Sequence, residues 1–407
     1  MKMLAAAATV AVLVLAAGGA SAVTDEALFP ISFWVGAPPQ YNTAGTYARM
    51  AAGGFTVALG GAGNAEYNRQ MLYFCAQNGL KAIVLDDRIG QAINGVQGWE
   101  RLLDAVVKDY GGNPALLAYF LTDEPNSAQF PALARVKEYL AKADPAHWSY
   151  INLFPNYASR EQLGNETYRE HVSQFLEVVK PAVLSWDHYA LLADSERANY
   201  FENLEICREE ALRAGVPFWQ IILSTPHYGY RDPKPGDFRW QDFTTLAYGG
   251  EGIMYFTYWA VSEFQNGVVD AEGRPTAHYP MIRRVNERVL AWAPVLLRCR
   301  SLAVYHAEPL PLGTHGVSPN PVVEAIQGDG LVGVLKDDAG TTYLMVVNRS
   351  PRAESRVRVT LREGVRHAAF ASGTEPLIWR PIIIPESSRC LSMRLSPGQG
   401  RLLRLGT

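Results

Sequence analysis

Eight short apolar segments, each followed by a longer amphipathic stretch, fill residues 31–292 and constrain the fold more than any other feature. Apolar runs bounded by turn residues are typical of buried strands, and apolar residues at helical spacing predict helices between them. The strands are expected at residues 31–36, 55–61, 80–88, 117–124, 148–154, 183–189, 217–224 and 252–259. The helices are expected at residues 64–78, 98–110, 131–143, 168–179, 196–214, 240–247 and 279–292.

Strands that alternate with helices pair in parallel through right-handed crossovers. Eight such units within residues 23–298 predict an α/β fold, a closed (β/α)₈ TIM barrel. An open doubly wound sheet is the alternative. The first strand is not followed by the Gly-x-Gly-x-x-Gly pattern of many such sheets, which favours the barrel.

The pattern changes near residue 301, where apolar and polar residues begin to alternate. Alternation with a period of two, interrupted by turn residues, is typical of antiparallel strands. We therefore expect residues 299–407 to form a small antiparallel β-sandwich domain. No low-complexity linker separates it from the barrel, so the two domains should pack together.

Residues 1–22 begin with Met1 and Lys2, continue through an apolar core and end in Ala20-Ser21-Ala22. These are the features of a secretory signal peptide cleaved after Ala22. No later segment has about 18 uninterrupted apolar residues, the length that a membrane-spanning helix needs. We expect a secreted or periplasmic protein with no membrane span after signal cleavage.

The composition, 48% hydrophobic and 19% charged, is that of a globular protein. A net charge of −3 does not favour nucleic acid as the partner. The four cysteines lack metal-ligand spacing, so we expect no metal and no cofactor. Export would permit a Cys299–Cys390 disulfide, although the sequence does not fix the pairing. Nine Trp and twenty Tyr offer rings that can stack on sugars.

Polar and aromatic residues gather where the predicted strands end, which is where barrel enzymes place their active sites. The segment LTDEPN, residues 121–126, brings Asp123 and Glu124 to the end of the fourth strand. Carboxylates and aromatic rings together suit glycoside hydrolysis, which needs a carboxylic acid and a second carboxylate. Glu124 is the candidate acid, because the charge of Asp123 would raise its pKa. The candidate substrate-binding residues are Trp34, Asp86, Asp123, Asn152, Tyr189, Tyr258, Trp259 and Glu263.

Structural roles compete with these assignments. Asp123 can cap the next helix, and Asp86 can cap the loop before the third helix. Trp34 and Tyr258 can be core residues. His188 is expected to be structural rather than a base.

LTDEPN, together with residues 239–259 and 268–289, resembles the exported clan A-type glycoside hydrolases related to β-galactosidases. The resemblance implies a (β/α)₈ barrel with a C-terminal β-sandwich and a retaining mechanism. It assigns Glu124 as acid/base, Trp259 as a floor for the sugar and Tyr189 as an aromatic hydroxyl near the nucleophile. Asp123 stands where these enzymes have an Asn that contacts the sugar 2-hydroxyl.

The seventh strand departs from that family, because residues 217–227 contain no carboxylate where the nucleophilic glutamate is expected. Gln220 is the nearest chemical relative, but it is neutral. Asp187 is the first substitute, since Ser185, Asp187 and Tyr189 share one strand face. Glu263 is the second. If Asp187 stands far from Glu124, a water molecule fits between the two carboxyls and the mechanism would be inverting.

We therefore expect an exported O-glycoside hydrolase with an oligo- or polysaccharide substrate, Glu124 as acid/base and Asp187 as nucleophile or base. The sugar, the linkage and the oligomeric state stay open. A carbohydrate-binding barrel without catalysis is the alternative, because the seventh strand lacks its glutamate. A metal-dependent hydrolase or lyase is disfavoured, because the histidines do not cluster.

Overall fold

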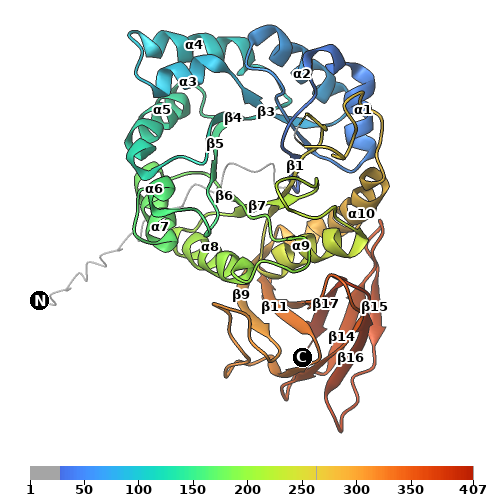
Figure 1. Ribbon diagram of the computed structural model, residues 1–407. Helices are drawn as coiled ribbons and strands as arrows, with labels where there is room; N and C mark the ends of the chain where they lie inside the picture. The colour runs from blue at the N-terminus through green and yellow to red at the C-terminus, as the bar shows by residue number, and fades with distance from the viewer. Residues whose placement is uncertain (1–27, 263, 407) are drawn as a thin grey trace, which may run out of the picture.

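The computed structural model describes residues 28–262 and 264–406. They form an eight-stranded parallel barrel surrounded by helices, with an antiparallel β-sandwich packed against one side of it (Figure 1). The expected TIM barrel with a small β-sandwich is confirmed. The predicted signal peptide, residues 1–22, lies outside the described residues.

The barrel strands pair in the order β1-β8-β7-β6-β5-β4-β3-β2. Their bounds are β1 Ile31–Phe33, β2 Val57–Leu59, β3 Lys81–Leu85, β4 Leu116–Asp123, β5 Trp148–Leu153, β6 Leu184–Asp187, β7 Phe218–Leu223 and β8 Gly252–Phe256. Thr56 joins β1 to β2: its N–H donates to the Ile31 oxygen at 2.9 Å, and its Oγ1 accepts from the Ile31 N–H at 2.8 Å. The strands are almost wholly buried, since side chains fill the inside and helices cover the outside.

The helices follow the expected alternation, with short additional turns. Their bounds are α1 Ala44–Ala52, α2 Ala65–Gln77, α3 Asp87–Ile93, α4 Trp99–Tyr110, α5 Phe130–Ala143, α6 Arg160–Leu163, α7 Tyr168–Val179, α8 Tyr200–Ala214, α9 Pro235–Ala247 and α10 His278–Leu296, with 3₁₀ turns η1 Pro39–Tyr41 and η2 Ser127–Gln129. In α4 the buried residues Leu103, Val106 and Tyr110 share the inner face. Helix α10 runs past Pro294, beyond its expected end at residue 292, because Val295 and Leu296 are buried.

The sandwich has a six-stranded sheet, β15-β14-β17-β12-β11-β9, and a three-stranded sheet, β10-β13-β16. The bounds are β9 Cys299–His306, β10 Val323–Gln327, β11 Gly330–Asp337, β12 Thr342–Asn348, β13 Ser355–Leu361, β14 His367–Ala371, β15 Trp379–Ile382, β16 Cys390–Leu395 and β17 Gly400–Gly406. Seven segments of the sequence that alternate apolar and polar residues are all strands: 323–328, 331–337, 341–350, 355–362, 367–373, 391–395 and 400–405. Strands β9 and β15 were not expected, and β15 is a short edge strand interrupted by Pro381.

Helix α9 joins the two domains (Figure 1). It packs against β7 on the barrel side and against β11, β12 and β17 on the other, so almost all of it is buried. The Trp240 indole donates to the Arg349 carbonyl at 2.8 Å, and on α10 the Trp292 indole donates to the Ser372 carbonyl at 2.7 Å. The domains therefore share one core.

All four cysteines are free, with Cys299 in the six-stranded sheet and Cys390 in the three-stranded sheet. The Cys299–Cys390 disulfide that export would permit is not formed. Within the described ranges, no helix is long and apolar enough to cross a membrane.

Candidate active site

A β-bulge in β4 places the first carboxylate. Phe120 lies opposite Tyr150 of β5, and Asp123 lies opposite Asn152, so β4 uses one residue more than its partner over this stretch. A bulge reverses the alternation of side chains beyond it. Asp123 therefore shares the side of the sheet on which Asn152 lies, at the carboxyl ends of the strands.

The backbone of Glu124 places the second carboxylate. Neighbouring residues in a strand point to opposite faces, so Asp123 and Glu124 would ordinarily diverge. Glu124 has a left-handed φ of 44°, and its N–H donates to the Asn152 carbonyl at 2.8 Å. A left-handed non-glycine residue is strained, and such strain is typical of functional sites. The turn brings the Glu124 carboxyl to the mouth of the barrel beside Asp123.

Asn152 links the carboxylates of β4 and β6. Its Nδ2 donates to Asp123 Oδ1 at 3.1 Å and to Asp187 Oδ1 at 3.0 Å. The Ser185 hydroxyl donates to Asn152 Oδ1 at 3.1 Å, and Tyr150 bonds to Ser185 at 2.7 Å. Since Ser185 occupies the amide oxygen, the amide nitrogen is directed at the two carboxylates.

The carboxyls of Glu124 and Asp187 are hydrogen-bonded to each other. Burial, followed by the charge of Asp123, raises the pKa of Glu124 to about 7. Burial, followed by the charges of Glu124 and Asp123, raises the pKa of Asp187 well above its usual value. Two carboxyls in such contact share a proton and titrate as a pair. Their mutual hydrogen bond raises the pKa of Asp187 and lowers that of Glu124, so the raised pKa values belong to the pair rather than to either residue.

Solvent reaches this mouth. Asp123 is exposed, although the surrounding protein raises its pKa to about 6 through desolvation. On a flat surface an exposed carboxyl would be well hydrated and its pKa would stay near the usual value. In a concave mouth the same carboxyl can be exposed to solvent and still be partly desolvated by the surrounding walls. Glu124 is half-buried, whereas Asp187 is only 4% exposed. A ligand can therefore meet Asp123 and Glu124 first, with Asp187 beneath them.

Aromatic rings stand beside the carboxylates. Trp34, beyond β1, is half-buried and makes an edge contact with Phe120 at 5.7 Å between ring centroids. Tyr189, beyond β6, is half-buried and lies 5.0 Å from the Phe256 ring at the end of β8. Burial, followed by the charges of Asp187 and Asp123, raises the pKa of Tyr189 well above its usual value.

Two aromatic residues predicted to bind substrate are buried elsewhere. Trp259 is 1% exposed and donates its indole N–H to the Ala271 carbonyl at 3.1 Å. Its ring lies against that of Tyr41, with 5.0 Å between the centroids and the planes tilted by 32°. Tyr258 is fully buried and packs on Phe33 at 4.6 Å. The structure does not bring either ring to the acidic cluster. β8 ends three residues before Trp259, so Phe256 stands at the strand end.

Asp86 also points away from the cluster. It caps α3, accepts from the Tyr110 hydroxyl at 2.6 Å and forms an ion pair with Arg88 at 2.8 Å. The capping alternative therefore describes Asp86. His188 is buried between the rings of Tyr157 and Tyr200, and burial lowers its pKa to about 3, so it is neutral and structural.

The seventh strand supplies no carboxylate to the cluster. Gln220 is fully buried and accepts a hydrogen bond from Thr245 of α9, so it faces the helix layer. Glu263, the second candidate nucleophile, lies outside the described residues. Asp187 is therefore the partner that the described part of the chain offers to Glu124.

Two neighbours of the cluster were missed by sequence reasoning. Phe256 is one, and its place as the last residue of β8 could have indicated it. Tyr157 is the other: its hydroxyl accepts from the Tyr189 N–H at 3.3 Å, and Arg197 covers its ring at 4.0 Å. Tyr157 lies in a loop after β5, where no strand periodicity predicts its direction.

Comparison with known proteins supports the fold. No protein-family model and no curated protein matches the chain. Among solved structures, a glycoside hydrolase family 5 protein from Bacteroides vulgatus matches with a TM-score of 0.60 and 10% identity, covering 94% of this chain and 92% of that one. Another structure, described as a glycoside hydrolase, matches with a TM-score of 0.59 and 12% identity, covering 94% and 96%. The expected likeness to clan A-type hydrolases holds for the fold of both domains.

Proposed function

We propose that this protein is a glycoside hydrolase that cleaves O-glycosidic bonds, with Glu124 as acid/base and Asp187 as nucleophile. The observation that carries the proposal is the hydrogen-bonded pair formed by these two carboxyls at the mouth of the barrel. A shared proton gives the pair what glycoside hydrolysis needs, one carboxylic acid and one carboxylate. The shared fold of known glycoside hydrolases adds support.

In the first step Glu124 donates its proton to the glycosidic oxygen as the bond from that oxygen to C1 breaks. The Asp187 carboxylate attacks C1 and forms a glycosyl ester. Glu124, now ionised, then takes a proton from water, and the water oxygen attacks C1 and releases Asp187. The Asn152 amide holds Asp187 by its Oδ1 throughout, which fixes the attacking carboxylate.

We propose retention of configuration. Inverting enzymes hold their carboxyls roughly 6.5–9.5 Å apart, which leaves room for water between acid and base. Glu124 and Asp187 are in hydrogen-bond contact, which is too close for that arrangement. Their close contact is nearer to the roughly 5–5.5 Å between the carboxyls of retaining enzymes.

The proposed substrate is a plant or microbial glycan met outside the cell. Exposed Asp123 offers a polar contact to sugar hydroxyls, and Trp34, Tyr189 and Phe256 offer ring faces. Asn152, also expected to bind substrate, is only 2% exposed and instead holds Asp123 and Asp187 in place. Export rests on the signal peptide expected at residues 1–22.

The test is the Glu124→Gln variant, assayed on a panel of aryl glycosides, with Glu138→Gln on the exposed face of α5 as control. Loss of a general acid lowers kcat by about 10²–10⁴-fold. We expect that loss for Glu124→Gln with an unchanged Tm, and wild-type turnover for Glu138→Gln. NMR of the first-formed anomer should show retention. Full activity of Glu124→Gln would refute the assignment.

A second candidate function is a carbohydrate-binding barrel without catalysis. The observation that favours it is the seventh strand, where Gln220 is turned away from the mouth. Calorimetry that detects glycan binding, with no product after prolonged incubation of the wild type, would favour this candidate over hydrolysis.

A further inference from the structure

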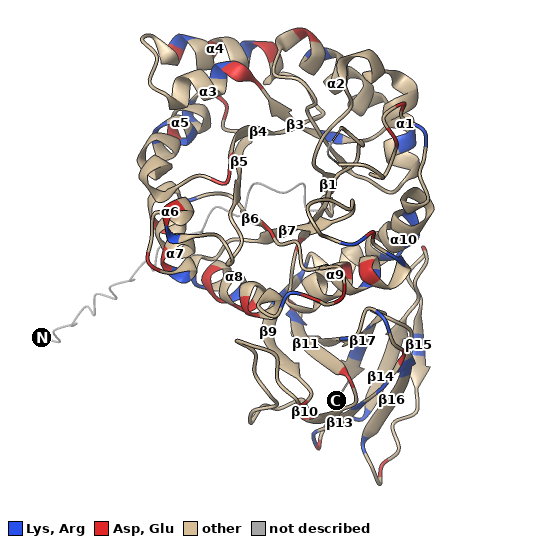
Figure 2. Cartoon of the chain, viewed as in Figure 1, with Lys and Arg blue, Asp and Glu red and all other residues tan. Residues whose placement is uncertain are grey.

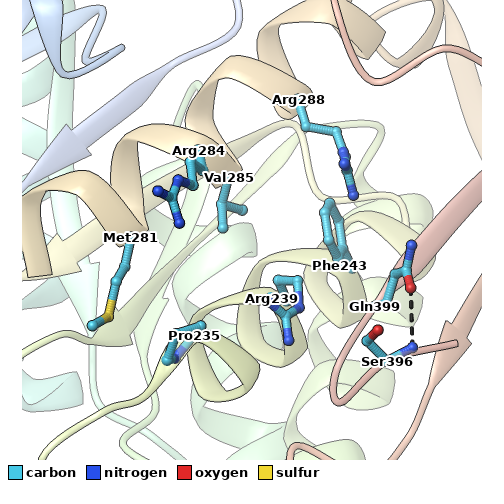
Figure 3. Close-up of a pocket in the computed structure, with 9 residues that line it drawn as sticks. All are labelled: Pro235, Arg239, Phe243, Met281, Arg284, Val285, Arg288, Ser396 and Gln399. Carbon is cyan, nitrogen blue, oxygen red and sulfur yellow. Dashed lines mark hydrogen bonds between the residues drawn. The ribbon is translucent and has the colours of Figure 1, made fainter. Parts of the chain in front are cut away.

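A cavity of about 270 Å³ lies between α9, α10 and the loop that leads into β17 (Figure 3). Arg239 of α9 and Arg284 and Arg288 of α10 line it from the barrel side. Ser396 and Gln399 line it from the sandwich, where the Ser396 N–H donates to the Gln399 side chain at 3.0 Å. None of these residues belongs to the barrel mouth, so this cavity is separate from the candidate active site.

A second cavity, of about 590 Å³, adjoins the first because Arg288 lines both. Its lining adds Arg380, Arg394 and Arg401. Arg288 fits against Gly373, where a Cβ would approach its Nε to 2.6 Å. We call the two cavities the arginine groove, defined by Arg239, Arg284, Arg288, Arg380, Arg394 and Arg401.

Most charges of the arginine groove lack a counter-charge. Of its six arginines, only Arg394 forms an ion pair with another residue that the structure describes, Glu354. The Arg239 Nε donates to the Pro397 carbonyl at 2.9 Å, which leaves its charge uncompensated. Burial, followed by the charges of Arg401 and Arg239, lowers the pKa of Arg288. Arg239, Arg288 and Arg401 are half-buried, whereas Arg284, Arg380 and Arg394 are exposed. Half-buried arginines without a carboxylate nearby are unfavourable unless an anion joins them.

The charge is concentrated in this part of an acidic chain. Residues 299–407 contain thirteen Lys and Arg against nine Asp and Glu, whereas the whole chain has a net charge of −3. Figure 2 shows basic positions on α9, α10 and the neighbouring sandwich strands. The barrel mouth instead holds Asp123, Glu124 and Asp187. A polyanion is therefore attracted to the groove more than to the mouth.

We propose that the arginine groove binds the anionic groups of a polysaccharide, sulfate esters or uronate carboxylates, and so holds the protein on its glycan. The guanidinium fork matches both groups through paired N–H donors. The choice of a glycan rests on the proposed function. Nucleic acid is less suited, because Phe243 in the lining is buried and Arg401 lies over Phe370, so neither ring is open for base stacking.

The test measures binding by the full-length protein to dextran sulfate and polygalacturonate, with uncharged dextran for comparison. The variant is Arg284→Gln with Arg288→Gln, and the charge-matched control is Lys142→Gln with Arg160→Gln on the exposed faces of α5 and α6. Losing two charge-assisted contacts should weaken binding to one or both anionic glycans at least tenfold. Turnover of a neutral aryl glycoside should not change in either variant.

Three outcomes separate this inference from the proposed function. Equal affinity of the two double variants would overturn it, as would binding of single-stranded DNA as tight as that of the anionic glycans. Arginine-dependent glycan binding by a protein that turns over no glycoside would support the groove and refute the hydrolase. If the double variant melts early, Arg284→Gln alone, at an exposed position, should still weaken binding about threefold or more.

Discussion

Asn152 is the residue on which the acidic cluster depends. Buried carboxylates in most proteins are paired with cations, but this amide offers only two N–H groups to Asp123 and Asp187. A neutral donor orients the carboxylates without cancelling their charge. Their pKa values therefore stay raised, which keeps a proton available near neutral pH.

The charge of Asp123 can be tested through the pH dependence of turnover. It raises the pKa of Glu124, so the Asp123→Asn variant should lower that pKa. Glu124 must be protonated to act as an acid, so the alkaline limb of kcat/KM should move to lower pH by about 0.5–1 unit. Asp338→Asn, on the exposed sandwich surface, is the control. An alkaline limb that stays in place would show that Asp123 does not tune Glu124.

Asp187 should make stability depend on pH. Folding raises the pKa of Asp187. Below about pH 4 the carboxyl is protonated in both the folded and the unfolded protein, and stability is greatest. As the pH rises towards the folded pKa, the unfolded protein ionises first and stability is lost. Asp187→Asn removes this loss. The variant should have a higher melting temperature than the wild type at pH 8, and the difference should vanish near pH 4. Thermal scans at both pH values check this, and a variant less stable than the wild type at pH 8 would contradict it.

Sequence patterns placed several site residues near the correct strand ends but could not give their directions. The structure brings Glu124, Asp123, Asn152 and Asp187 together. The bulge in β4 and the left-handed backbone of Glu124 bring these residues together, and neither feature shows as a periodic pattern in the sequence. Trp259 was assigned by resemblance, and its direction follows from contacts with distant loops that a local pattern does not encode.

At the scale of elements, alternation of apolar and amphipathic segments was sufficient for the barrel. All eight barrel strands were predicted, including β1 and β2, which have only three residues each. Helix α1 was missed, and α9 was predicted too short. Helix α9 is buried on nearly every side, so it lacks the polar face that marks an amphipathic helix.

Close contact between α9 and β11 gives a prediction at this scale. A Cβ on Gly333 would lie 1.9 Å from the Ala247 carbonyl oxygen, a backbone atom that cannot rotate away. Gly333→Ala should therefore destabilise the protein by about 1–3 kcal/mol or more. Gly45→Ala in α1 is the control, since nothing lies within 4 Å of its Cβ and alanine favours helix. Similar melting temperatures for the two variants would contradict the close packing.

For the whole molecule, the sandwich contributes to the core of the barrel domain. Trp240 and Trp292 are each 1% exposed and Phe243 is fully buried, and the indoles of both tryptophans donate to sandwich carbonyls. The candidate active site stands at the strand ends, whereas the arginine groove lies where the domains meet. Because the two domains share a core, the protein can bind a glycan at the arginine groove while the candidate active site cleaves another part of the same glycan.

Removing residues 299–407 should therefore disable the barrel, although no residue of the acidic cluster is lost. Exposing one large buried aromatic side chain costs about 1.5–3 kcal/mol, so three of them cost a large fraction of the stability of a typical domain. Residues 23–298 expressed alone should be mainly insoluble or melt well below the full chain. Co-expression of residues 299–407 as a separate chain should restore solubility, because the carbonyls of Arg349 and Ser372, which accept hydrogen bonds from Trp240 and Trp292, lie in that segment. A soluble barrel with the Tm of the full chain would show that the two domains are independent.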